Sequence, residues 1–217
     1  MHYIGEHQMG YHSLALGFPS IDGCHAICLQ TKAGLFGIHV LGRVDFDDRM
    51  EKEAQAFASF VQNHNQGQDF LHLYGTCFQK KRGWSPPMED RFKSWKKEIK
   101  VYAKKLGYKG RISHFDLSTL ANWPPKPNSK ENETDSAYVE YRRVFSEVTI
   151  LAKPWSQCGH DNVKANSVED TVNFQFAKNN GTATVCDKYS NNTCTYVNSK
   201  GSGFQITPAA IRQSFKY

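Results

Sequence analysis

The chain has 217 residues, of which 39% are hydrophobic and 22% are charged, and this balance excludes a wholly disordered protein. Its net charge of +6 favours acidic partners, but no basic helix is interleaved with aromatic residues, so we expect no nucleic acid partner. No apolar run has the length of a membrane span, and the N-terminus lacks the pattern of a cleavable signal peptide. We therefore expect a chain that is synthesised in the cytoplasm. If it is secreted into a target cell, the route does not use a cleavable leader.

Apolar residues alternate in some segments and recur at helical spacing in others, which predicts both strands and helices. Residues typical of helix termini mark the helices: Gly67 and Gly107 follow them, and Ser85 with Pro86 precedes the second. The expected elements are, in chain order, strands at 11–18, 25–30 and 35–41, a helix at 49–64, a strand at 69–78, a helix between 86 and 107, and strands at 111–120 and within 137–155.

These elements predict a fold of the α/β (α+β) class, in which helices pack on a mixed, largely antiparallel β-sheet. The segment 122–135, NWPPKPNSKENETD, is rich in proline and polar residues and is expected to be a linker. From residue 156 the composition shifts to Asn, Ser, Thr and Gly with short strand-like pieces. We therefore expect one domain over 1–155 and a β-rich C-terminal region of unknown role over 156–217.

Six cysteines are too few in a chain of this length for a secreted disulfide scaffold. None forms a C-x-x-C pair, and no group of histidines and cysteines has the spacing of a zinc motif, so we expect no metal and no cofactor. Cys186 and Cys194 flank a polar loop, and a disulfide between them is an alternative if the chain enters an oxidising compartment.

The segment GFPSIDGCHAICLQTKAGLFGIHVLGR, residues 17–43, holds a cysteine and a histidine in two neighbouring predicted strands. If the turn TKAG joins these strands, Ala26 lies opposite His39, and Cys24 shares its face two residues away. Diagonal neighbours of this kind are about 7–8 Å apart at Cα, which a histidine side chain can bridge. A slip of one residue would place the two side chains on opposite faces. The register therefore predicts that Cys24 and His39 meet.

A thiol beside an imidazole provides the two groups that nucleophilic catalysis needs at a minimum, a nucleophile and a base. A free cysteine has a pKa of about 8.5, and an adjacent histidine can take its proton and later protonate a leaving group. Gly23 leaves room for a substrate carbonyl, and the backbone N–H groups of Cys24 and His25 are candidate donors to an oxyanion. The alternative is that both residues belong to the core, since buried cysteines and strand histidines are common.

The hairpin GC-HAICLQ…GLFGIHVLG resembles the active-site hairpin of the chemotaxis receptor glutamine deamidase CheD and the catalytic domain of the cytotoxic necrotizing factor toxins. The order of elements after the hairpin is similar, so that the resemblance covers roughly residues 11–120. It implies a sandwich fold of the CheD type, with Cys24 as the nucleophile and His39 as the general base and acid. CheD has a threonine shortly before its cysteine, and Ser20 is the nearest hydroxyl here. Asp22 or a backbone carbonyl is an alternative group to orient His39.

The resemblance implies a protein-glutamine deamidase that works through a thioester, with a glutamine side chain on a partner protein as its substrate. A bacterial toxin or effector that modifies a host or competitor protein is the kind of protein implied. A cysteine protease and a transglutaminase-type effector use the same chemistry and stay open, as does a non-enzymatic protein-binding module. His114 and Asp116 share a strand face and are further candidates for a third catalytic residue. The basic loop QKKRGW at 79–84 is expected to be exposed.

Overall fold

The computed structural model describes most of the first 155 residues and the backbone of six short strands beyond them. The described ranges are 2–6, 8–45, 48–85, 91–120, 123–129, 133–155, 159–163, 171–176, 183–186, 194–198, 204–206 and 213–216.

In the described residues, two α-helices and two main sheets make up the fold, together with a short 3-10 helix at Leu117–Thr119 and two small two-stranded sheets. The larger sheet has the strand order β14-β13-β2-β5-β4-β7-β9-β17, and the smaller has the order β1-β3-β10-β11-β16. The elements are β1 (His2–Tyr3), β2 (Gln8–His12), β3 (Ala15–Ile21), β4 (His25–Thr31), β5 (Leu35–Val40), β6 (Arg43–Asp45), α1 (Asp48–His64), β7 (Phe70–Cys77), β8 (Gly83–Ser85), α2 (Arg91–Leu106), β9 (Arg111–Asp116), β10 (Ala137–Val144), β11 (Glu147–Pro154), β12 (Gly159–Val163), β13 (Thr171–Phe176), β14 (Ala183–Cys186), β15 (Cys194–Asn198), β16 (Phe204–Ile206) and β17 (Gln213–Lys216).

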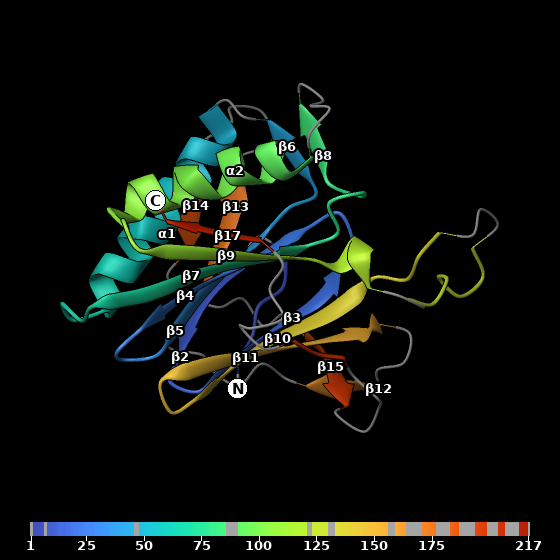
Figure 1. Cartoon of the computed structure of the whole chain (residues 1–217). Helices are drawn as coiled ribbons and strands as arrows, with labels where there is room; N and C mark the ends of the chain where they lie inside the picture. The colour runs from blue at the N-terminus through green and yellow to red at the C-terminus, as the bar shows by residue number, and fades with distance from the viewer. Residues whose placement is uncertain are drawn as a thin grey trace.

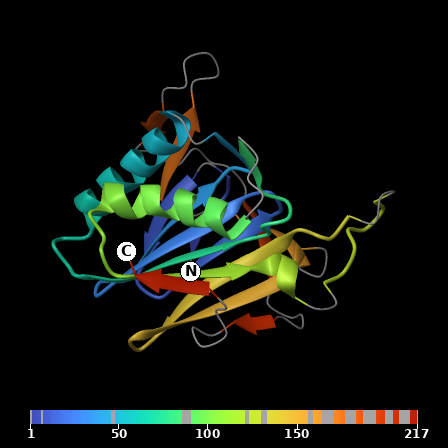
Figure 2. The same ribbon diagram turned by 45° about the horizontal axis from the view of Figure 1, so that its top comes forward.

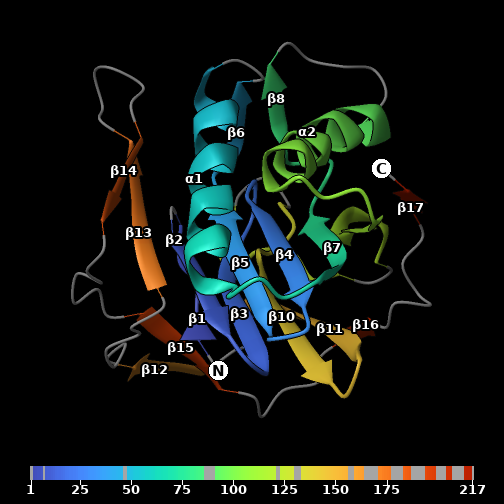
Figure 3. The same cartoon turned by 90° about the vertical axis from the view of Figure 1, so that its left-hand side faces the viewer.

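These elements form three layers, with the helices on one face of the larger sheet and the smaller sheet on the other (Figures 1 and 3). One apolar core lies between the helices and the larger sheet and includes Ile27 and Leu29 of β4. The second core lies between the two sheets and includes Ala26 and Cys28 of the same strand. Every residue of β4 is therefore buried, which explains the uninterrupted apolar run from Ala26 to Leu29 at its centre. The mixed α/β class and the mostly antiparallel pairing were predicted, and the structure confirms both.

The two helices have the expected faces. Met50, Ala54, Phe57, Ala58 and Val61 of α1 are all buried against the larger sheet. In the described part of the chain, neither helix combines the length and the apolar character needed to cross a bilayer.

Gly107 ends α2 as the sequence predicts, with a positive φ of 66°. The N–H of Gly107 donates to the carbonyl of Lys104, and the N–H of Tyr108 donates to that of Ala103, which is the pattern of a Schellman cap. The proposed N-cap of this helix at Ser85 and Pro86 is only partly within the described residues, since 86–90 lie outside them.

The single strand expected at 11–18 is in fact two strands in different sheets. The chain turns at Ser13 and Leu14, where Nδ1 of His12 accepts hydrogen bonds from the N–H groups of Leu14 and Ala15, both at 3.0 Å. β2 before this turn joins the larger sheet, and β3 after it joins the smaller one. The alternation of apolar residues continues without a shift through this turn. The alternation therefore cannot reveal the turn.

The N-terminal segment lies between the two sheets. β1 pairs with β3 in parallel, and the N–H of Ile4 continues this pairing by donating to the carbonyl of Gly17 at 2.8 Å. The Ile4 side chain is fully buried over Gly37 of β5, where a Cβ atom would approach Cδ1 of Ile4 to 2.9 Å and Cζ of Phe18 to 2.7 Å. Gly37 therefore allows the backbone of residues 4–6 to lie close to β5.

Four of the described strands beyond residue 155, β13, β14, β16 and β17, belong to the two main sheets rather than to a sheet of their own. β13 pairs with β2, β16 pairs with β11, and β17 pairs with β9. Figure 2 shows β17 as the red arrow beside the C-terminus. β12 and β15 pair with each other. Cys186 ends β14 and Cys194 begins β15, and a disulfide between them lies outside the described residues, because no side chain is described there.

Candidate active site

The β4–β5 hairpin has the register predicted from its turn. Ala26 pairs with His39, and Gln30 pairs with Leu35. Cys24 immediately precedes β4, and its thiol lies within 4.8 Å of a ring nitrogen of His39. Both side chains are buried, with exposed fractions of 4% and 1%. The structure therefore brings together the two residues that the sequence pairs.

The tautomer of His39 follows from its contact with the N-terminal segment. Nδ1 of His39 lies 2.9 Å from the carbonyl oxygen of Ile4. Because a carbonyl oxygen only accepts, Nδ1 carries the hydrogen and donates it, and Nε2 keeps the lone pair. A backbone carbonyl thus orients the imidazole with Nε2 as its basic nitrogen, which is one of the two alternatives left open by the sequence.

Glu6 contacts the buried thiol of Cys24. The Cys24 thiol donates to Oε1 of Glu6 across 3.6 Å, and Glu6 is exposed whereas Cys24 is buried. Burial and, after it, the negative charge of Glu6 raise the pKa of Cys24 to about 12, although the guanidinium of Arg82 acts in the opposite direction. In this arrangement the thiol is protonated, and catalysis would need Glu6 to be displaced or the proton to pass to His39 during attack.

Replacing Glu6 with alanine is therefore expected to lower the pKa of Cys24, because a charge and a hydrogen bond that favour the thiol are removed. The rate of Cys24 alkylation by iodoacetamide is followed by peptide mass spectrometry from about pH 6 to 10. With a pKa of about 12 this rate rises without a plateau, and a plateau within this range shows that the pKa has fallen. At a pH below the pKa, each unit by which the pKa falls raises the thiolate fraction roughly tenfold. Glu133→Ala, at an exposed carboxylate paired with Lys126, is the control. A faster reaction whose rate still rises with pH without a plateau would mean that Glu6 only limits access.

A buried ionic network supports the hairpin from the side of α2. Arg82 donates to Oε1 of Glu98 at 2.6 Å, and its Nη1 donates to the carbonyls of Gly23 at 2.6 Å and Leu41 at 2.5 Å. Gly23 precedes Cys24, and Leu41 follows His39 by two residues. One guanidinium thus links the ends of both strands that carry the candidate pair.

His25 completes this network as a neutral imidazole. Its Nε2 accepts from the indole N–H of Trp95 at 3.3 Å, so the hydrogen is on Nδ1, which donates to Glu98 at 3.1 Å. Burial lowers the pKa of His25 despite the neighbouring carboxylate. For Glu98, burial acts to raise the pKa, but Arg82 and then His25 outweigh it and hold the pKa well below its usual range.

Gly23 has a packing role that the sequence does not reveal. A Cβ atom on Gly23 would lie 3.2 Å from the carbonyl of Lys81 and 3.4 Å from Cα of Gly42. A Cβ atom on Gly42 would in turn lie 3.3 Å from the backbone of Gly23. The two glycines let the ends of the hairpin approach each other beside Arg82.

No family model matches this sequence, and no curated protein matches it. The likeness to the CheD and necrotizing factor deamidases stays a prediction, based on the hairpin residues and on the order of the elements that follow.

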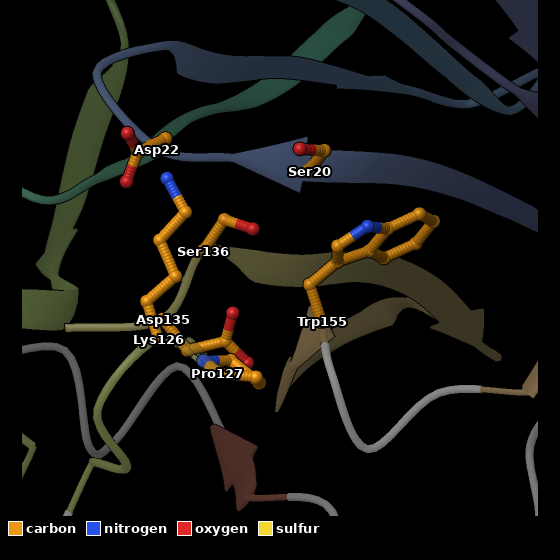
Figure 4. Close-up of a pocket in the computed structure, with 7 residues that line it drawn as sticks. All are labelled: Ser20, Asp22, Lys126, Pro127, Asp135, Ser136 and Trp155. Atoms are coloured by element: carbon orange, nitrogen blue, oxygen red, sulfur yellow. The ribbon is translucent and has the colours of Figure 1, made fainter. Parts of the chain in front are cut away.

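Ser20 and Asp22, the other two predicted site residues, line a separate hollow of about 350 Å³ (Figure 4). Asp22 forms an ion pair with Lys81, and Ser20 has a positive φ of 55° at the end of β3. Neither Cys24 nor His39 lines this hollow. The carbonyl of Ile4, and not Asp22, therefore contacts and orients His39, and Asp22 pairs with Lys81 instead.

His114 and Asp116 also have structural partners. Nδ1 of His114 donates to the carbonyl of Gly75 at 2.9 Å, and its Nε2 accepts from the amide of Gln79 at 2.9 Å. Asp116 accepts from the backbone N–H groups of Gln79 and Ser118, both at 2.9 Å. These bonds fix the loop after β7 rather than the hairpin.

The sequence interpretation missed Glu6, Ile4, Arg82 and Glu98. The loop at 79–84 was expected to be exposed, but Arg82 is 5% exposed and bonded on all sides. One signal was available: Glu98 lies within the apolar stripe of α2, three residues after Trp95, and a charge in such a stripe indicates a buried partner. Glu6 and Ile4 carry no comparable signal.

Proposed function

We propose that this chain is a protein-glutamine deamidase in which Cys24 is the nucleophile and His39 moves the protons. The observation that carries the proposal is the orientation of His39. Its Nδ1 hydrogen is committed to the Ile4 carbonyl, and the ring lies within 4.8 Å of the Cys24 sulfur. This leaves the Nε2 lone pair as the base for the thiol, which is the arrangement that an acyl-transfer enzyme requires.

In the proposed reaction, Nε2 of His39 takes the thiol proton as the sulfur attacks the carboxamide carbon of a glutamine. The negative charge develops on the carboxamide oxygen, where backbone N–H groups next to Cys24 would stabilise it. His39 returns the proton to the nitrogen, the C–N bond breaks, and ammonia leaves a thioester. His39 then deprotonates a water molecule that attacks the thioester, which releases glutamate and restores the Cys24 thiol.

The position of Glu6 favours a side-chain carboxamide over a peptide bond as substrate. The Glu6 side chain reaches the buried sulfur from an exposed position, with its carboxylate oxygen 3.6 Å from Sγ. A glutamine side chain has the same length and shape as this glutamate. A segment of main chain is bulkier on both sides of its carbonyl, and Cys24 is too deeply buried to meet it without a larger opening.

The wider proposal assigns the chain to the CheD-like and necrotizing factor-like deamidases, with an exposed glutamine on a protein as substrate. The hairpin register and the helices packed on a largely antiparallel sheet support this assignment. Proteolysis, amine transfer and simple binding are the competing functions, and each leaves a different product.

The test is to incubate the wild-type chain with cell lysate proteins and to search for glutamine-to-glutamate conversions by mass spectrometry. Cys24→Ser is expected to abolish them. His39→Asn is expected to slow them by roughly 10²–10⁴-fold, as the loss of a general base does. Cys28→Ser is the matched control, because Cys28 is buried in the same core, lies four residues further along in β4 and has no role in the proposed reaction.

Conversions that persist in Cys24→Ser would refute the proposed nucleophile. Cleaved peptides that depend on Cys24 would indicate a protease, and amine-linked glutamines would indicate a transglutaminase. If no covalent product depends on Cys24, and Cys24 does not react faster than Cys28 with iodoacetamide, the hairpin pair belongs to the core of a binding module.

A further inference from the structure

Three side chains at the hairpin have the donor types of a zinc site. A carboxylate oxygen of Glu6, the sulfur of Cys24 and a ring nitrogen of His39 all lie within 4.8 Å of one another. Zinc binds oxygen, sulfur and nitrogen ligands of these kinds. The sequence spacing gives no zinc motif, because the three residues come from the N-terminal segment and from two different strands of a hairpin.

The distance between the Cys24 sulfur and the Glu6 carboxylate oxygen fits two ligands of a tetrahedral ion. With Zn–S and Zn–O bonds of about 2.3 and 2.1 Å, two ligands at a tetrahedral angle are about 3.6 Å apart. Sγ of Cys24 and Oε1 of Glu6 are 3.6 Å apart. The His39 nitrogen lies within 4.8 Å of both atoms and would need to come closer to them by at most about 1.4 Å to be the third ligand, which small side-chain rotations can supply.

The surroundings of His39 also match those of a metal-bound imidazole. Histidine ligands in proteins usually donate their second N–H group to a carbonyl or carboxylate, which fixes the tautomer and the ring. Nδ1 of His39 donates in this way to Ile4. Nε2 therefore has the lone pair that a metal needs.

The charges around Cys24 favour a dication. In the absence of a cation, burial and the carboxylate of Glu6 both oppose the thiolate. The nearby cation, Arg82, is paired with Glu98 and bonded to two carbonyls, so its charge is largely compensated. A zinc ion would neutralise the charges of Glu6 and of a Cys24 thiolate together. Because Glu6 is exposed, an ion from solvent can reach the site at this residue.

We propose that Glu6, Cys24 and His39 bind one zinc ion, with water as the fourth ligand, and that the bound ion inhibits the chain by occupying its nucleophile. The inhibition rests on the proposed deamidase function, whereas the binding does not. Zinc would thereby act as a regulator that must be removed before Cys24 can attack a substrate.

A second cluster provides an internal contrast. His25, Cys77 and His114 also offer three donor atoms within 4.8 Å, but all three are buried. Both ring nitrogens of His25 are engaged, with Trp95 and Glu98, and both of His114 with Gly75 and Gln79. No lone pair of either ring is left for a metal, so we expect this cluster not to bind zinc.

The binding is tested with Co²⁺ as a spectroscopic probe, added to the full chain after treatment with a chelator and a reductant. A thiolate-to-cobalt charge-transfer band in the near ultraviolet is expected, rising to one equivalent, and Zn²⁺ should abolish it by displacement. Cys24→Ser should remove the band, and Glu6→Ala and His39→Asn should each weaken binding at least tenfold. Cys77→Ser, which removes the thiol of the second cluster, should leave the band unchanged.

A band that survives in Cys24→Ser, or that disappears in Cys77→Ser with the fold intact by circular dichroism, would overturn the assignment. So would a wild-type chain that binds no cobalt. Because this readout needs no substrate, the two proposals fail separately. If the chain binds cobalt but makes no glutamate, the zinc site is supported and the deamidase function is contradicted. If the chain deamidates proteins but binds no cobalt, the deamidase function is supported and the zinc site is contradicted.

Discussion

A chain carrying Glu6→Gln is expected to convert its own glutamine back to glutamate. The introduced side chain would hold its carboxamide where the Glu6 carboxylate now lies, with an oxygen 3.6 Å from the Cys24 sulfur. A reacting group held this close acts as if present at a very high concentration, on the order of 10⁵ M or more. The freshly purified variant should therefore release one equivalent of ammonia, and the peptide that contains residue 6 should acquire the mass of glutamate.

The controls for this reaction separate enzymatic conversion from spontaneous deamidation. Glu6→Gln combined with Cys24→Ser should keep its glutamine, and Glu6→Gln combined with Cys28→Ser should convert like the single variant. The rate should not depend on protein concentration, because the reaction is within one molecule. A glutamine that persists beside a reactive Cys24 would contradict the proposal that Glu6 occupies the substrate position.

Replacing Arg82 with methionine is expected to reduce the free energy of unfolding by about 3–5 kcal/mol, the usual cost of removing one partner of a buried ion pair. The loss arises because Glu98 would remain buried without its guanidinium partner, and because the carbonyls of Gly23 and Leu41 would lose their donor. Lys105→Met, which breaks a more exposed pair with Glu51, is the control and should cost less than about 1 kcal/mol.

The contribution of Glu98 to the pH dependence of stability should shrink with this substitution. In the wild-type chain the pKa of Glu98 is depressed, so its contribution is present above the unfolded pKa of about 4.3 and is lost as the pH falls below it. In Arg82→Met, His25 still lowers the pKa of Glu98 but Arg82 no longer does, so this pKa rises towards its unfolded value and less of the pH-dependent stabilisation remains.

Urea unfolding from about pH 2 to 7 measures both effects. The additional substitution Glu98→Leu should restore part of the lost stability and remove the pH dependence that Glu98 contributes, because no charge then remains buried without its partner. Equal losses in Arg82→Met and Lys105→Met would contradict the role assigned to the network.

The parts of the fold set by local residues could be predicted. The turn TKAG and the alternation around it determined the β4–β5 register, and this register brings Cys24 and His39 together. The apolar stripe from Met50 to Val61 gave the buried face of α1. In both cases the information lies within a few residues of the contact.

The rest depends on contacts between distant segments. Glu6 reaches Cys24 only because Ile4 is held by Gly17 and packs over Gly37, and none of these residues has a local pattern that indicates the contact. Arg82 appears in the sequence as one of several cations in a polar loop, although α2 and the hairpin enclose it. The sequence likewise gives no sign that strands after residue 155 complete both sheets.

The acceptor that orients His39 is a peptide carbonyl, and this has a consequence for genetic studies of the chain. Every substitution of Ile4 that preserves the backbone leaves the carbonyl oxygen in place. Under the proposed reaction, an alanine scan would accordingly not reveal the group that orients His39, because alanine at position 4 keeps this carbonyl. Selection during evolution likewise cannot act on this carbonyl through the side chain at position 4. The residue at this position is therefore free to vary among side chains that fill the space over Gly37.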